Sequence, residues 1–275
     1  MYSTLGVVAN SKRKGKLTGT HQKIDRCARW LLNKNVPVAQ RKFPSYDEIV
    51  YFEGYRGPDG IKRKSPGIDE PSHFILPGKD DGVLIGYIDD HFYNLVVALK
   101  QKNEVRAAFE AAWMAHAIVD GLTPAHHYPY QEVVEELMNY QDIKTIFGKR
   151  IKGIMRGDNI AQAARNNWLY WGANGVITKH VAFEYGVAQA ITPIPMKRLA
   201  PKDIKLEDYK NIGYRKAFYD ALEKIANLKM YDRFLDKGWT TELVIETCEI
   251  LIPEIIKAVS LAWADALLEA NKRGK

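Results

Sequence analysis

Cysteine is scarce in this sequence, and its scarcity excludes the kinds of site that need several thiols. Cys27 and Cys248 are the only two cysteines among 275 residues. Two thiols cannot build a disulfide framework or a cysteine-type zinc finger. A single bridge between them stays open as an alternative, but we expect both to lie buried as free thiols on apolar helix faces.

Long apolar runs are also missing. No segment approaches the roughly 20 apolar residues that a helix needs to cross a bilayer, so we expect no transmembrane segment. Residues 1–16, MYSTLGVVANSKRKGK, lack the apolar core of a signal peptide, and their charges follow the apolar patch instead of preceding it. For the sequence as written we therefore expect a cytoplasmic location.

Strict alternation of apolar and polar residues, which is typical of half-buried strands, is not sustained anywhere in the sequence. Apolar residues recur instead at helical spacing, which predicts an all-α fold, a single-domain bundle of several helices. Residues 1–17 are rich in glycine, serine and lysine and are expected to form a flexible basic leader, followed by the helical domain at 18–275.

The periodic segments place the helices approximately. After a first helix that Thr18 or Thr20 can cap, helices are expected at about 82–101, 102–121, 158–172, 176–191, 214–229 and 240–272, with weaker helical stretches between 121 and about 147. Val105 is expected on the inner side of the second of these segments, and Pro253 is expected to kink the last one. Residues 41–82 hold most of the early glycines and prolines and are predicted to form a long loop.

The charge balance is basic, with 40 lysines and arginines against 33 aspartates and glutamates. This excess favours anionic partners such as phosphates, nucleic acids or lipid headgroups, but it selects none of them. Hydrophobic residues make up 46% of the chain and charged residues 27%, which is ordinary for a globular protein and excludes global disorder.

Two segments place a histidine and a carboxylate four residues apart. These are His116 and Asp120 in HAIVDGLTPAHH, and His180 and Glu184 in KHVAFE. Residues i and i+4 of a helix lie on one face, one turn apart, so each pair can bind one metal ion. A single pair of this kind is more often an exposed polar pair, and only the combination of two favours a metal centre.

A proline and a further histidine complete the first segment. Pro124 ends the helix that carries His116 and turns the chain, which lets His126 face the same side from another direction. Imidazole nitrogens and carboxylate oxygens are ligands that zinc accepts. The residue types and their spacing together therefore predict a zinc centre.

The pattern His116-x3-Asp120-x3-Pro124-x-His126 resembles the signature of the zinc-dependent phospholipase C family, whose relatives include the fungal single-strand-specific nucleases. Counterparts of that family's remaining ligands follow in the family's order, namely His21, Asp59, His73, His180 and Glu184. The resemblance spans about 21–184. It implies an all-α fold and hydrolysis of phosphate esters by a metal-activated water that attacks phosphorus.

Residue by residue, the resemblance implies three zinc sites. The first would be held by Asp59, His73, His116 and Asp120. The second would be held by His126, His180 and Glu184. His21 and Asp120 would hold the third, so that Asp120 would bridge two ions and take a catalytic role. Asp59 would be the second catalytic carboxylate, which orients or deprotonates the attacking water.

The N-terminus departs from the family pattern. In the family, which is often secreted, the backbone of an N-terminal tryptophan completes the third zinc site. This sequence begins with Met1 and has no tryptophan before His21. The third site is therefore empty, completed by Met1 folding back, or completed by another group such as Asp25. Ala117 and Val119 also replace residues that are usual inside the signature.

Several other residues lie near these motifs in the sequence. Tyr55, shortly before Asp59, and His127, beside His126, are candidates for contacts with a substrate. His91 follows two aspartates, but consecutive helix residues diverge by about 100°, so we expect a polar face there. The segment NNWLYW at 166–171 is either an interfacial aromatic patch or part of a buried helix, and we favour the buried helix.

These observations predict a zinc-dependent phosphoesterase similar to phospholipase C. Its partner would be a phosphate ester, which could be a phospholipid headgroup, a nucleotide or a nucleic acid, and no obligate protein partner can be inferred. One alternative is a nuclease or phosphodiesterase for single strands, which would need stacking aromatics and a basic groove. Another is a scaffold protein that binds zinc without turnover, since structural sites are closed whereas catalytic sites keep an open position.

Overall fold

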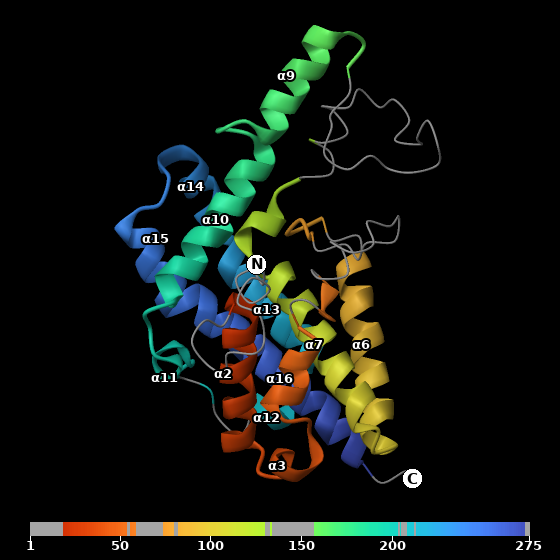
Figure 1. Cartoon of the computed structure of the whole chain (residues 1–275). Coiled ribbons are helices and arrows are strands. Elements are labelled where there is room, and N and C mark those ends of the chain that lie inside the picture. Colours follow the sequence, from red (N-terminus) through yellow and green to blue (C-terminus); the bar gives the residue numbers. More distant parts are fainter. Residues whose placement is uncertain are drawn as a thin grey trace.

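The computed structural model describes residues 19–53, 56–58, 74–79, 82–129, 133, 157–202, 204, 208–211 and 213–272. These residues form helices and no strand (Figure 1), which confirms the all-α prediction. The expected leader at 1–17 lies outside the described residues. The helices are α2 (Thr20–Asn35), α3 (Ala39–Lys42), α4 (Tyr46–Tyr51), α6 (Val83–Lys100), α7 (Glu104–Gly121), the 3-10 helix η2 (Pro124–His127), α9 (Ile160–Trp171), α10 (Val176–Ile191), α11 (Met196–Leu199), α12 (Asp208–Asn211), α13 (Tyr214–Ala226), α14 (Met230–Lys237), α15 (Thr241–Glu246), the π-helix η3 (Thr247–Leu251) and α16 (Ile252–Asn271).

Helix α16 is the centre of the bundle and packs against α2, α6, α7 and α13 (Figure 1). Its sequence is apolar around most of the helix, and a helix of this kind must be buried on several sides. Trp263 is fully buried and donates from Nε1 to the Ala111 carbonyl of α7, 3.0 Å away. The alanines of α7 allow this close approach, so α7 and α16 form a tightly packed pair at the core.

A π-helical segment directly precedes Pro253, the residue at which a kink was predicted. The Ile252 N–H bonds to the Thr247 carbonyl, five residues earlier, in the π-helical segment that separates α15 from α16. Proline has no N–H to donate, and a π-turn accommodates the break in the ladder of helix bonds. The single helix expected at 240–272 is therefore three consecutive segments.

Two other expectations from the sequence were wrong. The loop predicted for 41–82 contains α4, which Ser45 starts by accepting from the Glu48 N–H in a capping box. Val105, expected on the inner side of α7, is 70% exposed, because the helix begins at Glu104 and its first turn lies at the surface.

Of the two cysteines, Cys27 is buried as expected, whereas Cys248 is only half-buried, and both are free thiols.

Helices α9 and α10 occur where the periodicity predicted them, but the burial of α9 was predicted wrongly. The segment at 166–171 carries exposed aromatic side chains, with Trp168 exposed by 69%. Helix α10 is well buried, and Gly186 lets the Trp239 ring lie directly on it, since a Cβ there would come within 1.9 Å of the indole. Figure 1 shows α9 beyond the outer end of α10, away from the central helices.

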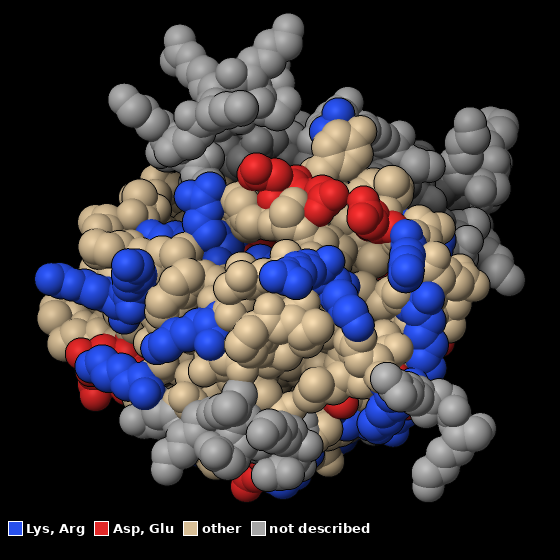
Figure 2. Space-filling view, turned by 90° about the horizontal axis from the view of Figure 1, so that it is seen from below, with Lys and Arg blue, Asp and Glu red and all other residues tan. Residues whose placement is uncertain are grey.

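The opposite end of the bundle, where α3 lies, carries many of the basic side chains (Figure 2). A cleft at this end is lined by Arg41, Lys42, Lys100 and Lys102, together with Glu48 and Glu104. Figure 2 shows the lysines and arginines spread over the face and not gathered in one stripe. The basic charge of the chain is therefore not concentrated in a single binding groove on this face.

A buried arginine fixes the connection between α2 and α4. Arg29 is 5% exposed, and its guanidinium donates to three backbone carbonyls, those of Ala39, Phe43 and Pro44. Each of these distances is 3.1 Å or less. The planar guanidinium supplies several donors in a fixed arrangement, which a lysine or a neutral side chain cannot replace.

We expect Arg29→Met to lower the free energy of unfolding by about 2–4 kcal/mol, because three buried carbonyls would lose their donor. Urea denaturation monitored by circular dichroism measures this change. Arg41→Met is the matched control, since Arg41 is exposed in the same segment, and it should stay within about 0.5 kcal/mol of the wild type. Equal losses in the two variants would contradict the structural role of Arg29.

Candidate metal centre

The first group of candidate ligands joins α2 to α7. His21 comes from the first turn of α2, while His116 and Asp120 come from one face of α7, as their spacing predicted. One ligand atom from each of the three residues lies within 4.8 Å of the others. All three residues are 2% exposed or less.

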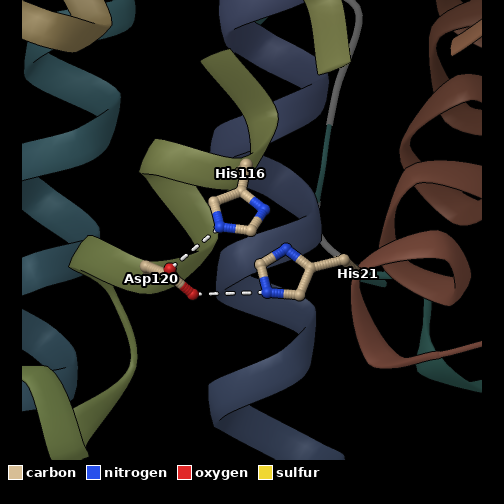
Figure 3. Close-up of side chains that lie close together, drawn as sticks. All are labelled: His21, His116 and Asp120. Atoms are coloured by element: carbon tan, nitrogen blue, oxygen red, sulfur yellow. Dashed lines mark ion pairs between the residues drawn. The ribbon is translucent and has the colours of Figure 1, made fainter. Parts of the chain in front are cut away.

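The Asp120 carboxylate lies between the two imidazoles (Figure 3). Its Oδ1 is 3.3 Å from His21 Nε2, and its Oδ2 is 3.2 Å from His116 Nε2. The two rings are stacked with their centroids 4.3 Å apart. Each carboxylate oxygen therefore faces a different histidine, which is the arrangement needed for a carboxylate that bridges two cations.

The second group joins the segment after α7 to α10. His126 lies in η2, and His180 and Glu184 share one face of α10. Glu184 Oε1 is 3.0 Å from His126 Nε2 and 3.3 Å from His180 Nε2. Pro124 begins η2, so the chain turns there as the sequence predicted, and His126 meets α10 from a second direction. These three residues are the complete set that the resemblance implied for the second zinc.

The electrostatics of both groups suit a bound cation. Burial by itself raises the pKa of Asp120, but its electrostatic interactions, among them those with His116 and His126, hold that pKa well below its usual range. Burial likewise opposes ionisation of Glu184, yet its bonds to His126 and His180 help to keep its pKa well below normal. Burial also lowers the pKa of His126. Ionised carboxylates and neutral imidazoles are the forms that bind metal ions.

The separations between the donor atoms are compatible with a bound metal ion. A tetrahedral site with bonds of about 2.0 Å has donors about 3.3 Å apart. The distances from the carboxylates to His21, His116 and His180 are 3.2–3.3 Å. Among the described residues, neither ring nitrogen of His21 has a hydrogen-bond partner that meets the geometric criteria, and a buried polar atom is costly while it stays unpaired. Two groups that could hold a metal ion are thus present, of the donor type that zinc accepts.

The two groups lie close enough to interact electrostatically. His126 of the second group contributes to the lowered pKa of Asp120, and Asp120 in turn opposes the lowering of the pKa of His126. Phe74 stacks on the His126 ring with the centroids 4.9 Å apart, and it also lies beside His180. The centre is therefore two neighbouring groups, one side of which is covered by an aromatic ring.

Glu53 is a residue of the site that the sequence did not reveal. It follows α4, is 4% exposed, and its Oε1 accepts a hydrogen bond from His116 Nδ1 at 2.9 Å. This bond places the proton of His116 on Nδ1 and leaves Nε2, the atom that faces Asp120, with its lone pair. No spacing pattern links positions 53 and 116, so only the tertiary structure could bring them together.

Asp25 lies beside this pair. It is 1% exposed, and neither of its oxygens has a hydrogen-bond partner within the described part of the chain. Burial together with the charge of Glu53 raises its pKa well above the usual value. The sequence contained a signal for it, since Asp25 follows His21 by four residues on α2, the same spacing as in the two motifs. It does not belong to the converging group of His21, His116 and Asp120.

Of the remaining predicted site residues, some lie outside the described part of the chain and others have contacts of their own. Asp59, His73 and Tyr55 lie outside the described residues, so the first predicted zinc site is placed only through His116 and Asp120. His127 donates from Nε2 to the Gly121 carbonyl at 3.0 Å, and burial lowers its pKa to about 4. Its contact with a substrate stays a prediction. His91 bonds to the buried Glu110 and belongs to neither group.

Comparison of the chain with protein-family models, with curated proteins and with solved structures finds no match. The resemblance to the zinc-dependent phospholipase C family therefore stays a prediction, carried by the motifs and by the geometry of the two groups. Among the described residues, no helix is both long enough and apolar enough to cross a bilayer.

We expect Glu53→Ala to weaken metal binding at the first group by about 10–100-fold, because His116 would lose the acceptor that orients it. Glu53→Gln, which keeps an acceptor, should weaken binding less. Metal bound per chain after dialysis against buffered zinc measures both effects. Glu110→Ala is the matched control, because it removes another buried glutamate, one that bonds to His91. Unchanged metal affinity in Glu53→Ala would contradict the positioning role.

Proposed function

We propose that this chain is a zinc-dependent phosphoric ester hydrolase of the phospholipase C type. The observation that carries the proposal is the Asp120 carboxylate, whose oxygens lie 3.3 Å from His21 Nε2 and 3.2 Å from His116 Nε2. The two histidines come from different helices, so each can belong to a different metal ion. Paired metal ions bridged in this way are a common solution for displacement at phosphorus.

The second group supports the same proposal. His126, His180 and Glu184 supply two imidazole nitrogens and a carboxylate oxygen, which leaves a fourth position of a tetrahedral zinc site open. When bound, zinc would activate a water molecule and stabilise the charge that develops on the phosphoryl and leaving oxygens. An open position next to a second metal group is what a catalytic zinc site would keep, whereas a structural zinc site would be closed.

The residues of the chain have separate roles in the proposed reaction. Asp120 and Glu184 supply the negative charge that holds the cations, and Glu53 keeps His116 in the required tautomer. Asp59, placed by the family resemblance, takes a proton from the attacking water. The water oxygen bonds to phosphorus, the ester P–O bond breaks, and the proton passes to the leaving oxygen.

The proposed substrate class is the phosphate ester, and the excess of basic residues over acidic ones favours such an anion. Phospholipid headgroups, nucleotides and single-stranded nucleic acids share this chemistry. Lecithin, single-stranded DNA and a small phosphomonoester, compared at equal enzyme concentration, separate these substrates. A protein that binds zinc but hydrolyses none of them would be the scaffold alternative.

We expect Asp120→Asn to lower both metal content and hydrolysis of a chromogenic phosphodiester. The amide keeps the shape of the side chain but removes the charge shared by two cations, an effect worth several kcal/mol or about two orders of magnitude in rate. Elemental mass spectrometry and initial rates measure the two effects. His91→Ala should leave both nearly unchanged, since His91 bonds to Glu110 away from the two groups. Unchanged metal content in Asp120→Asn would exclude the bridging role.

The dialysed wild-type protein should contain about two to three zinc ions per chain, because the two groups and the bridging carboxylate provide that many positions. A chelator should abolish phosphodiester hydrolysis, and added zinc should restore it. Less than one zinc per chain after reconstitution would overturn the hydrolase proposal. Full zinc content without any hydrolysis would support the scaffold alternative.

A further inference from the structure

A cleft of about 670 Å³ lies where α7 begins, at the end of the bundle where α3 lies. Asn103, which caps α7, lines this cleft, whereas His116 comes thirteen residues later on the same helix. At 1.5 Å per residue, this spacing places the candidate metal centre about 20 Å away. Binding sites for small molecules commonly have volumes of about 300–1,000 Å³. The cleft is therefore large enough for a small ligand and is separate from the metal centre.

The deepest part of the cleft is apolar. Ala98 of α6, Ala107 of α7 and Leu267 of α16 line it, and each of these residues is buried. Leu99 and Ala270 line it as well and are partly buried. Alanine side chains are short, so the three helices leave space between them at this point. An apolar floor of this kind favours a ligand that carries a carbon skeleton and not only charge.

The charged side chains around the cleft are mostly basic. Five cationic residues line it, namely Arg29, Arg41, Lys42, Lys100 and Lys102. The acids are Glu48 and Glu104 in the lining and the exposed Asp47 beside Glu48 in the sequence. Positive charge therefore exceeds negative charge even when all three carboxylates are counted, and the cleft attracts anions.

Three of the five cations are available to a ligand. Within the part of the chain that the structure describes, Arg41, Lys100 and Lys102 take part in no ion pair. The charge of Lys100 reaches Glu269, but that carboxylate is already paired with Lys272. These exposed cations can therefore turn to an anion in the cleft without breaking an ion pair of the fold.

Arg29 adds a buried positive charge to the wall of the cleft. It is 5% exposed, and its acceptors among the described residues are neutral, namely three backbone carbonyls and the Asn33 side chain. Burial lowers the pKa of Arg29 to about 10, although the charge of Glu48 acts in the opposite direction. Glu48 itself accepts from the Ser45 N–H and Oγ, at 2.6 and 2.7 Å. A buried cation with neutral acceptors is costly, and an anion in the cleft would offset part of that cost.

We propose that this cleft binds a small organic phosphate, whose phosphoryl group meets Arg41, Lys100 and Lys102 while its carbon skeleton lies on the apolar floor. A phosphate dianion bonds to several cations at once, and arginine and lysine are its usual partners. The other basic side chains of this face are dispersed (Figure 2), so they form no continuous track for a long polyanion. Binding here involves none of the candidate metal ligands, so it stands independently of the proposed hydrolysis.

Titration calorimetry with phenylphosphonate tests the proposal, since this probe carries a dianion and an apolar ring but no ester bond to hydrolyse. We expect the wild type to bind it, and the Lys100→Gln, Lys102→Gln double variant to bind at least about tenfold more weakly, because two charged donors are lost. The Lys100→Arg, Lys102→Arg variant should keep most of the affinity. The difference between wild type and the glutamine variant should shrink at high salt. Circular dichroism checks that both variants are folded.

A matched variant and two simpler anions complete the test. Lys197 and Arg198 are exposed cations on α11 that do not line the cleft, so the Lys197→Gln, Arg198→Gln variant should bind as the wild type does. Inorganic phosphate, which lacks the ring, and benzoate, which lacks the dianion, should each bind more weakly than phenylphosphonate.

Two results would overturn the cleft as the binding site. One is no binding of phenylphosphonate by the wild type, and the other is equal binding by the Lys100→Gln, Lys102→Gln variant, which would place the probe elsewhere. Benzoate that binds as tightly as phenylphosphonate would overturn the phosphate class. Equal binding of inorganic phosphate would overturn the role of the apolar floor and with it the organic ligand.

Discussion

The negative charge of Asp120 is buried between two imidazoles, and much of the molecule is arranged around the need to compensate it. The residue is 2% exposed in the interior of a helical bundle, where an unpaired carboxylate is very costly. His21 and His116 approach its two oxygens from α2 and α7. The carboxylate therefore connects two helices that are distant in sequence, and it couples the packing of the bundle to the charge at its centre.

Further buried acids increase that coupling. Glu53 and Asp25 lie near His116 and are almost fully buried, so the region contains three carboxylates and two histidines with little access to water. Burial raises the pKa of Asp25, and the neighbouring charge of Glu53 raises it further. A metal ion bound in such a place would contribute directly to folding, because the candidate ligands are also part of the core.

The second group has a different structural setting. It lies where the chain leaves α7 through η2 and meets α10, and α10 continues outward toward α9. A single helix therefore carries His180 and Glu184 and, through a turn that requires glycine at Gly172, determines the orientation of the exposed tryptophans. Two candidate ligands, His180 and Glu184, and the exposed tryptophans of α9 therefore belong to one stretch of the chain.

Local sequence determined the helices and the paired ligands of this protein, and the tertiary structure decided the rest. His116 with Asp120, and His180 with Glu184, could be predicted because a helix places residues i and i+4 on one face whatever the rest of the chain does. The bond from His116 to Glu53 could not be predicted, since it depends on where the segment after α4 packs. The exposure of Trp168 was equally hidden, because helical periodicity shows which residues share a face but not whether that face meets the core or the solvent.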